Sequence, residues 1–265
     1  MIAVDLDGTL LLSDHTLAPE GTRALAAAAE RGVAVVISTT RNLDSVRRFA
    51  SEIGLEQPII CTNGAHILAS SDGPTWIRRT IPSDLARALV ERADAEGWSL
   101  ISTVNETTYY RRQGDEPLGE VRPGRMTVAC NAEVPDWGDP IRILNYEPAA
   151  ISEIREFLAG DFPGHYHLET YLHSDDSIKS IGIYAAGSDK GTALRFVLDR
   201  LGLHPAHVMA IGDNPNDLPM FRCATVRVAM GNATRDVRAA ATVMAPTHDA
   251  EGVAWAVRRY VLDKE

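Results

Sequence analysis

The first 80 residues alternate short apolar runs with amphipathic segments. An apolar run at 2–4, in a strand predicted at 2–6, is followed by a segment with helical spacing at 19–31 and by a second apolar run at 33–37. Short apolar runs bounded by turn residues are typical of buried strands, and a strand, a helix and a parallel strand form a βαβ unit. A helix at 42–54 and a strand at 58–61 extend the pattern. The sequence therefore predicts a parallel sheet with helices on both faces.

The pattern changes near residue 82. Helices are predicted at 83–96 and 149–158, among strands in which polar and apolar residues alternate. Such alternation is typical of a sheet with one face in water. These strands are predicted at 99–104, 107–111, 126–130, 141–146, 166–171 and 180–184. The middle of the chain is therefore predicted to be an inserted α+β domain.

The first pattern returns after residue 186. A helix begins near Lys190, and an apolar strand is predicted at 208–212. Shorter strands at 225–229 and 242–245 and an amphipathic helix at 251–262 follow. The predicted fold is α/β, a doubly wound and mainly parallel Rossmann-like core with an inserted α+β cap domain. We assign residues 1–80 and 186–265 to the core and residues 81–185 to the cap.

Composition and charge narrow the class of protein. The formal net charge is −10 and no long basic stripe is present, which argues against a nucleic-acid or anionic-membrane binder. The three cysteines are widely spaced, so neither a disulfide framework nor a zinc site is indicated. Without a leader pattern or an apolar run near 18 residues, the chain is expected to be cytoplasmic. We expect a monomer or weak homodimer whose partner is a small anionic molecule.

Two acidic strings each follow an apolar strand. The string DLDGT at residues 5–9 follows the first strand, and GDNPND at 212–217 follows the strand at 208–212. Either string alone is compatible with a solvated acidic turn. If the two strands are neighbours, however, Asp5, Asp7, Asp213 and Asp217 converge at one sheet edge and repel one another. Because hard oxygen ligands without Cys or His favour Mg²⁺, the strings indicate a magnesium site.

Two further positions are candidates for binding an anion. The string STTR at 38–41 ends the second strand, where a hydroxyl and backbone N–H groups can hold phosphate oxygens. Lys190 is one of only three lysines among 26 basic residues and lies at a predicted helix start. A lysine kept in an arginine-rich chain suggests a need for a compact charge. Taken singly it could be an exposed helix residue, but the agreement of all the motifs in residue type, order and strand-end placement favours a functional role. Together with Mg²⁺, these groups indicate phosphoryl transfer.

These motifs, in this order, resemble the four motifs of the haloacid dehalogenase superfamily. The cap between the second and third motifs, with NGA at 63–65 and AMGNA at 229–233, resembles its Cof-type phosphatases, which have a C2-type (IIB-like) cap. The resemblance covers nearly the whole chain. One departure is Thr40, where the family usually has glycine. Its side chain occupies space that glycine leaves open, so the close approach of the backbone to phosphate or cap is expected to differ here.

The resemblance implies a role for each matched residue. Asp5 is expected to be the nucleophile and Asp7 the general acid and base. Thr39, Lys190 and Asn216 are expected to bind phosphate. The expected Mg²⁺ ligands are Asp5, Asp213, the main-chain carbonyl of Asp7 and, through water or from outside the first shell, Asp217; Arg41, Asn63 and Gly64 are candidate substrate or cap contacts.

The predicted function is Mg²⁺-dependent hydrolysis of a small phosphorylated metabolite, a sugar phosphate or a phosphorylated cofactor, through an aspartyl-phosphate. The alternatives are a phosphomutase of the phosphomannomutase type and a more specialised sugar-phosphate phosphatase such as mannosyl-3-phosphoglycerate phosphatase. A glycosyltransferase using Asp5 and Asp7 would leave Lys190 and the second acidic string unexplained. A non-catalytic phosphate-binding module would not need the intact acidic pair.

Overall fold

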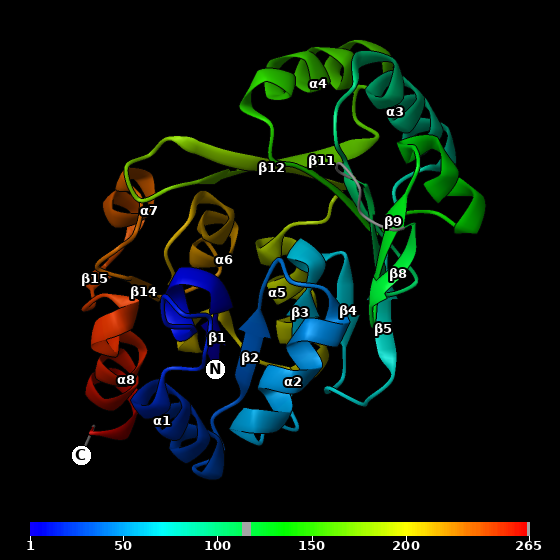
Figure 1. Cartoon of the computed structure of the whole chain (residues 1–265). Helices are drawn as coiled ribbons and strands as arrows, with labels where there is room; N and C mark the ends of the chain where they lie inside the picture. The colour runs from blue at the N-terminus through cyan, green and yellow to red at the C-terminus, as the bar shows by residue number, and fades with distance from the viewer. Residues whose placement is uncertain (113–117, 264–265) are drawn as a thin grey trace. The chain divides into compact units, whose positions relative to one another are not determined.

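The computed structural model describes residues 1–112 and 118–263, and the chain divides into two compact units (Figure 1). The core unit comprises Met1–Ile77, Leu172–Ser177 and Asp189–Glu265. The insert unit comprises Arg78–Tyr171 and Ile178–Ser188. The core is therefore built from both ends of the chain.

The core unit contains an eight-stranded sheet in the order β15-β14-β13-β1-β2-β3-β4-β5. The first six strands in this order, from β15 to β3, run parallel to one another. Strand β4 then pairs with β3 in the antiparallel direction. The last two strands, β4 and β5, were not predicted from the hydrophobic pattern. The strand bounds are β1 Ile2–Val4, β2 Val35–Ser38, β3 Ile59–Cys61, β4 His66–Leu68, β5 Thr75–Arg78, β13 Met209–Gly212, β14 Val226–Ala229 and β15 Val243–Met244.

Helices cover both faces of this sheet because its central strands, β1, β2, β3 and β13, are buried on both sides. On β1, Ile2 and Val4 belong to the hydrophobic cluster that includes residues of α1, α2 and α8. Between them, Ala3 belongs to the opposite cluster, which includes residues of α5, α6 and α7. This alternation is what a doubly covered parallel sheet requires. The helix bounds are α1 Pro19–Glu30, α2 Leu43–Ile53, α5 Lys190–Leu201, α6 Leu218–Phe221, α7 Arg235–Ala240 and α8 Gly252–Val257.

The final helix is shorter than predicted. The amphipathic pattern at 251–262 forms α8 only as far as Val257, and a π-helical turn, Arg258–Leu262, continues it. No helix in the described part of the chain has the length and apolar character needed to cross a membrane.

The insert unit has its own seven-stranded sheet, in the order β11-β12-β10-β6-β7-β9-β8. Two helices, α3 (Ser83–Glu96) and α4 (Pro148–Asp161), contribute to one hydrophobic cluster with Ile143, Ile181 and Ile183 of the sheet. The helices therefore share one face of an α+β sheet. The strands are β6 Ile101–Val104, β7 Thr107–Arg111, β8 Gly119–Arg122, β9 Arg125–Val128, β10 Arg142–Asn145, β11 Tyr166–Leu172 and β12 Ile178–Ala185.

Candidate active site

The two acidic strings meet because their strands are neighbours in the core sheet. Strand β1 pairs with β13 in parallel, with Val4 opposite Ile211, and the backbone N–H of Asp5 donates to the Ile211 carbonyl at 3.1 Å. The carboxyl ends of parallel strands lie at the same sheet edge. Asp5 and Asp213 are therefore brought side by side, as the sequence predicted for adjacent strands.

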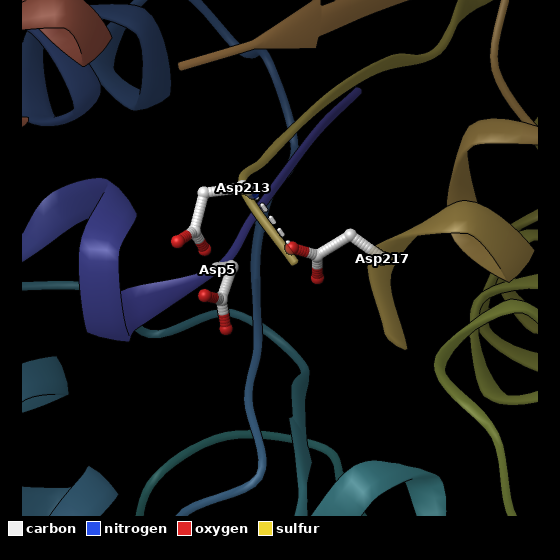
Figure 2. Close-up of side chains that lie close together, drawn as sticks. All are labelled: Asp5, Asp213 and Asp217. Atoms are coloured by element: carbon white, nitrogen blue, oxygen red, sulfur yellow. Dashed lines mark hydrogen bonds between the residues drawn. The ribbon is translucent and has the colours of Figure 1, made fainter. Parts of the chain in front are cut away.

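Three carboxylates form one buried cluster at this edge (Figure 2). Asp5, Asp213 and Asp217 each offer an oxygen, and these oxygens lie within 4.8 Å of one another. Their exposed fractions are 5%, 9% and 0%. A cluster of hard oxygen donors at this spacing fits a divalent cation. The side chain of Asp7 is not part of the cluster.

Lys190 is completely buried and lies against this cluster. Its Nζ donates to Asp5 Oδ1 at 2.7 Å and to Asp217 Oδ1 at 2.6 Å. Helix α5 begins at Lys190 because the Asp189 side chain caps it, accepting from the backbone N–H groups of Gly191 and Thr192. This burial excludes the alternative that Lys190 is an exposed helix residue.

Burial and mutual repulsion disfavour the charged forms of two carboxylates of the cluster. Burial raises the pKa of Asp5 to about 7, against the attraction of Lys190. Burial, together with the charges of Asp217 and Asp5, raises the pKa of Asp213 well above its ordinary value. Burial opposes the charged form of Lys190, but the two carboxylates outweigh it and raise the pKa of this amine. One lysine does not neutralise three carboxylates, so a bound cation would relieve the remaining repulsion.

Asp217 also orders the loop that carries Asp213. Its Oδ2 accepts from the backbone N–H of Asp213 at 2.9 Å, the contact drawn in Figure 2, and from that of Asn214 at 3.1 Å. Its other oxygen, Oδ1, accepts a hydrogen bond from Lys190 Nζ. Asn216 is buried in the same short turn, Pro215–Asp217. Asp217 therefore joins the lysine to the second acidic string.

Thr39 lies at the end of β2 and is completely buried. Its Oγ1 accepts from the backbone N–H of Arg41 at 3.2 Å, and its carbonyl accepts from the N–H of Asn63 at 3.0 Å. The Thr62 N–H in turn donates to the Arg41 carbonyl at 2.8 Å. The loops after β2 and β3 are thus bonded together.

The side chains of Asp7 and Arg41 form a two-fold ion pair. Nε of Arg41 donates to Asp7 Oδ2 at 2.7 Å, and a terminal nitrogen donates to Oδ1 at 2.6 Å. Burial would raise the pKa of Asp7, but the hydrogen bonds and charge of Arg41 hold that pKa below its ordinary value. Arg41, predicted from sequence as a substrate or cap contact, contacts a candidate catalytic residue.

The loop after β3 is held in an unfavourable backbone conformation. Thr62, Asn63 and Gly64 have φ values of 51°, 53° and 88°. The Asn63 side chain is buried, and its amide has no hydrogen-bond partner within the described ranges. A Cβ on Gly64 would lie 2.5 Å from the Asp189 carbonyl at the start of α5. Only glycine allows this close packing of the loop against the helix that carries Lys190.

We expect Gly64→Ala to destabilise the protein more than Gly54→Ala, measured by urea unfolding. Both glycines have positive φ, which costs alanine about 1 kcal/mol. A Cβ on Gly54 meets nothing within 4 Å, whereas one on Gly64 meets backbone. The contact should add about 1–3 kcal/mol of destabilisation. Equal losses for the two variants would show that the loop shifts to accept the methyl group.

Two residues that support the cluster were not identified from sequence. Asn232 Nδ2 donates to the Gly8 carbonyl at 2.8 Å and lies 3.5 Å from Asp213 Oδ2. Thr9 Oγ1 is 3.5 Å from Asp213 Oδ1. Both lie inside strings noted in the sequence, DLDGT and AMGNA, but neither string indicates which side chain turns toward Asp213.

Comparison with known proteins gives a consistent result. The model of the haloacid dehalogenase-like hydrolases matches residues 2–257. A 5-amino-6-(5-phospho-D-ribitylamino)uracil phosphatase of Bacillus subtilis is 30% identical over 99% of this chain and 96% of its own length. A pyridoxal phosphate phosphatase of Escherichia coli is 26% identical over 96% of both chains.

A solved structure supports the same relationship at the level of the fold. A haloacid dehalogenase-like hydrolase from B. subtilis superposes with a TM-score of 0.84, at 23% identity, over 98% of this chain and 99% of that chain. The predicted fold class, a doubly wound core with an inserted α+β domain, is confirmed.

Proposed function

Since this chain belongs to the haloacid dehalogenase-like hydrolases and is a phosphatase of the Cof type, as its motifs predicted, we propose that it is Mg²⁺-dependent and acts through an aspartyl-phosphate. The observation that carries the proposal is the placement of Lys190 between Asp5 and Asp217 at the end of two adjacent strands. A buried cation beside a carboxylate nucleophile lowers the repulsion between that carboxylate and a phosphate dianion.

In the first step Asp5 Oδ attacks phosphorus. A bond forms between phosphorus and Asp5 while the bond to the leaving oxygen breaks, and Asp7 supplies the proton that this oxygen takes. Lys190 and the Thr39 hydroxyl hold the phosphoryl oxygens, with Asn216 completing the phosphate-binding set. Holding charged groups in fixed positions is the main protein contribution to phosphoryl transfer.

In the second step water attacks the phosphorus of the aspartyl-phosphate. The carboxylate of Asp7 removes a proton from this water as the bond between phosphorus and Asp5 breaks. Phosphate is released, and Asp5 is again a free carboxylate. One side chain thus acts as acid in the first step and as base in the second, and both transfers require it near the same bond.

The donor set of the site fits Mg²⁺. Asp5 and Asp213 would hold it through their side chains and Asp7 through its main-chain carbonyl, with Asp217 acting through water or from outside the first shell. When bound, Mg²⁺ neutralises charge on the phosphoryl oxygens and the carboxylates.

The substrate is proposed to be a small phosphorylated metabolite, a sugar phosphate or a phosphorylated cofactor. The relatives named above are phosphatases of a ribityl phosphate and of pyridoxal phosphate. We assign selectivity among such esters to the inserted domain, at residues 81–185, because the core residues that would bind phosphate contact a group common to all of them.

The direct test is release of phosphate from a panel of phosphometabolites by the purified chain, with Mg²⁺ and with EDTA. We expect at least one sugar or cofactor phosphate to be hydrolysed with Mg²⁺ and none with EDTA. A protein that isomerises a sugar phosphate without net release, and only with a bisphosphorylated activator, would be a mutase. A panel without turnover of either kind would contradict the proposal.

We expect Asp213→Asn to raise the Mg²⁺ concentration that gives half-maximal activity by at least about tenfold. The substitution removes one charged ligand but keeps the size of the side chain. The matched control is Asp44→Asn, because Asp44 is an exposed carboxylate at the start of α2. This variant should leave the Mg²⁺ concentration for half-maximal activity unchanged. An unchanged Mg²⁺ requirement in Asp213→Asn would remove Asp213 from the ligand set.

A further inference from the structure

The side-chain amide of Asn232 joins three other loops at the carboxyl ends of the core strands. Its Nδ2 donates to the Gly8 carbonyl, at 2.8 Å, in the loop after β1. The same nitrogen lies 3.5 Å from Oδ2 of Asp213, in the loop after β13. Its Oδ1 accepts from the backbone N–H of His248, at 3.1 Å, in the segment after β15. Because Asn232 itself follows β14, one side chain connects the ends of four neighbouring strands.

The bond from His248 determines which way this amide faces. A side-chain amide has two donor hydrogens on its nitrogen and accepts only through its oxygen. Since Oδ1 of Asn232 is bonded to a backbone N–H, Nδ2 faces two oxygens, the Gly8 carbonyl and the Asp213 carboxylate, and has one hydrogen for each. The reversed amide would bring an oxygen against those two oxygens and a nitrogen against the His248 N–H. Hydrogen-bond matching therefore fixes Asn232 as a donor to both loops.

Gly8 is the residue of the first acidic string whose backbone has the most freedom to rotate. It has φ 75° and ψ 4° and no Cβ to restrict it. A Cβ at this position would collide with the Asp213 carboxylate, so the backbone and the carboxylate lie in close contact. The Asn232 bond to the Gly8 carbonyl limits rotation of this backbone, and with it rotation of the adjacent Asp7 carbonyl, an expected Mg²⁺ ligand.

The Asp213 carboxylate is directed toward the acidic cluster and keeps room for a cation. Asn232 Nδ2 lies beside its Oδ2 and Thr9 Oγ1 beside its Oδ1, both at 3.5 Å. A carboxylate has about four acceptor sites, so two long contacts do not use them up. In this orientation Asp213 presents an oxygen within 4.8 Å of oxygens of Asp5 and Asp217. The orientation that Asn232 supports is therefore the one that completes the candidate metal site.

We propose that Asn232 is a positioning residue of the metal site, which holds the Asp7 carbonyl and the Asp213 carboxylate in the geometry that Mg²⁺ requires. This inference rests on the proposed function and adds to it a residue outside the ligand set. Mg²⁺ requires nearly ideal octahedral coordination, whereas Ca²⁺ accepts a larger and more flexible set of oxygens. Loss of Asn232 should therefore weaken the binding of Mg²⁺ much more than that of Ca²⁺.

The experiment measures the Kd of each metal ion alone by isothermal titration calorimetry, on protein treated with EDTA and then dialysed. For Asn232→Ala we expect the Mg²⁺ Kd to rise by about tenfold, which is the scale for removing a group that orients metal ligands. The Ca²⁺ Kd should rise by less than about threefold, because that ion tolerates displaced ligands. Urea unfolding in EDTA shows whether each variant is folded.

Ser13→Ala is the matched control, because it loosens the segment after β15 from its other side. The exposed Ser13 hydroxyl donates to Asp249 Oδ2 at 2.6 Å and lies 3.1 Å from Nε2 of His248. Its bonds reach the segment that holds Asn232 but not Gly8 or Asp213. We therefore expect both Kd values to stay at those of the wild type.

Two results would overturn the inference and leave the proposed function intact. One is an unchanged Mg²⁺ Kd in Asn232→Ala, and the other is an equal loss for Mg²⁺ and Ca²⁺, which a merely structural role would produce. If Asn232→Ala is unfolded at the temperature of the titration, Asn232→Ser decides by the same ratio, because its hydroxyl is one atom shorter than the amide. A wild type that binds no Mg²⁺ contradicts the metal requirement of the proposed function itself.

Discussion

Asp5→Asn is expected to lower phosphate release by at least about 10⁴-fold, because an amide in place of the attacking carboxylate removes the nucleophile. The size of the side chain is unchanged, and Lys190 keeps its bond to Asp217. The variant should therefore fold, with a melting temperature close to that of the wild type. The rate is measured under saturating Mg²⁺ with the best substrate of the panel.

The same variant tests the covalent intermediate. Acid quenching of wild type during turnover of a ³²P-labelled substrate should leave label on the protein, and hydroxylamine should remove it. Asp5→Asn should carry no label, while the exposed control Asp44→Asn should behave as wild type. If Asp5→Asn retained most of the activity, direct attack by water would replace the covalent mechanism.

Lys190→Met is expected to combine a loss of activity of about 10³-fold with a loss of stability that depends on Mg²⁺. Methionine fills a similar volume but leaves Asp5 and Asp217 buried without their cation. Removing one partner of a buried ion pair lowers the free energy of unfolding by about 3–5 kcal/mol. Mg²⁺ binding to the folded state should restore part of this, because a ligand of the native state stabilises it.

The measurement is urea unfolding in EDTA and in Mg²⁺, with the exposed Lys179→Met as the control. The increase in the free energy of unfolding on adding Mg²⁺ should be larger for Lys190→Met than for wild type or Lys179→Met. If Lys190→Met were as stable as wild type in EDTA, the charge of Lys190 would not be needed to stabilise the three buried carboxylates.

Much of the core fold was predictable because it depends on local patterns. Runs such as 2–4 and 33–37 are apolar on both sides, which is typical of buried strands, and Gly54 ends α2 in the left-handed conformation that was expected of a helix stop. Strands β4 and β5 were missed for the opposite reason. Strand β5 is partly exposed and has no apolar alternation, so its place at the sheet edge depends on pairing and not on its own composition.

The candidate site was predictable where it lies on strand ends and less so where it depends on contacts between side chains. Asp5 and Asp213 follow apolar strands, so the adjacency of β1 and β13 was enough to bring them together. The bonds of Arg41 to Asp7 and of Asn232 to Gly8 join residues 34 and 224 positions apart. No periodicity records such contacts, because the direction of a long polar side chain is decided by its surroundings.

Local patterns along the chain predicted most of the strands and helices, although not β4, β5 or β8, together with the acidic strings at two strand ends and the family that these motifs resemble. Hydrophobic periodicity and turn residues act over a few positions, so they can be read along the chain. The burial of Lys190 between Asp5 and Asp217 and the bond of Arg41 to Asp7 follow from the packing of the folded chain and from no local pattern. These contacts join separate segments, and their strength comes from the burial of charge, which arises only when the sheet and its helices have packed together.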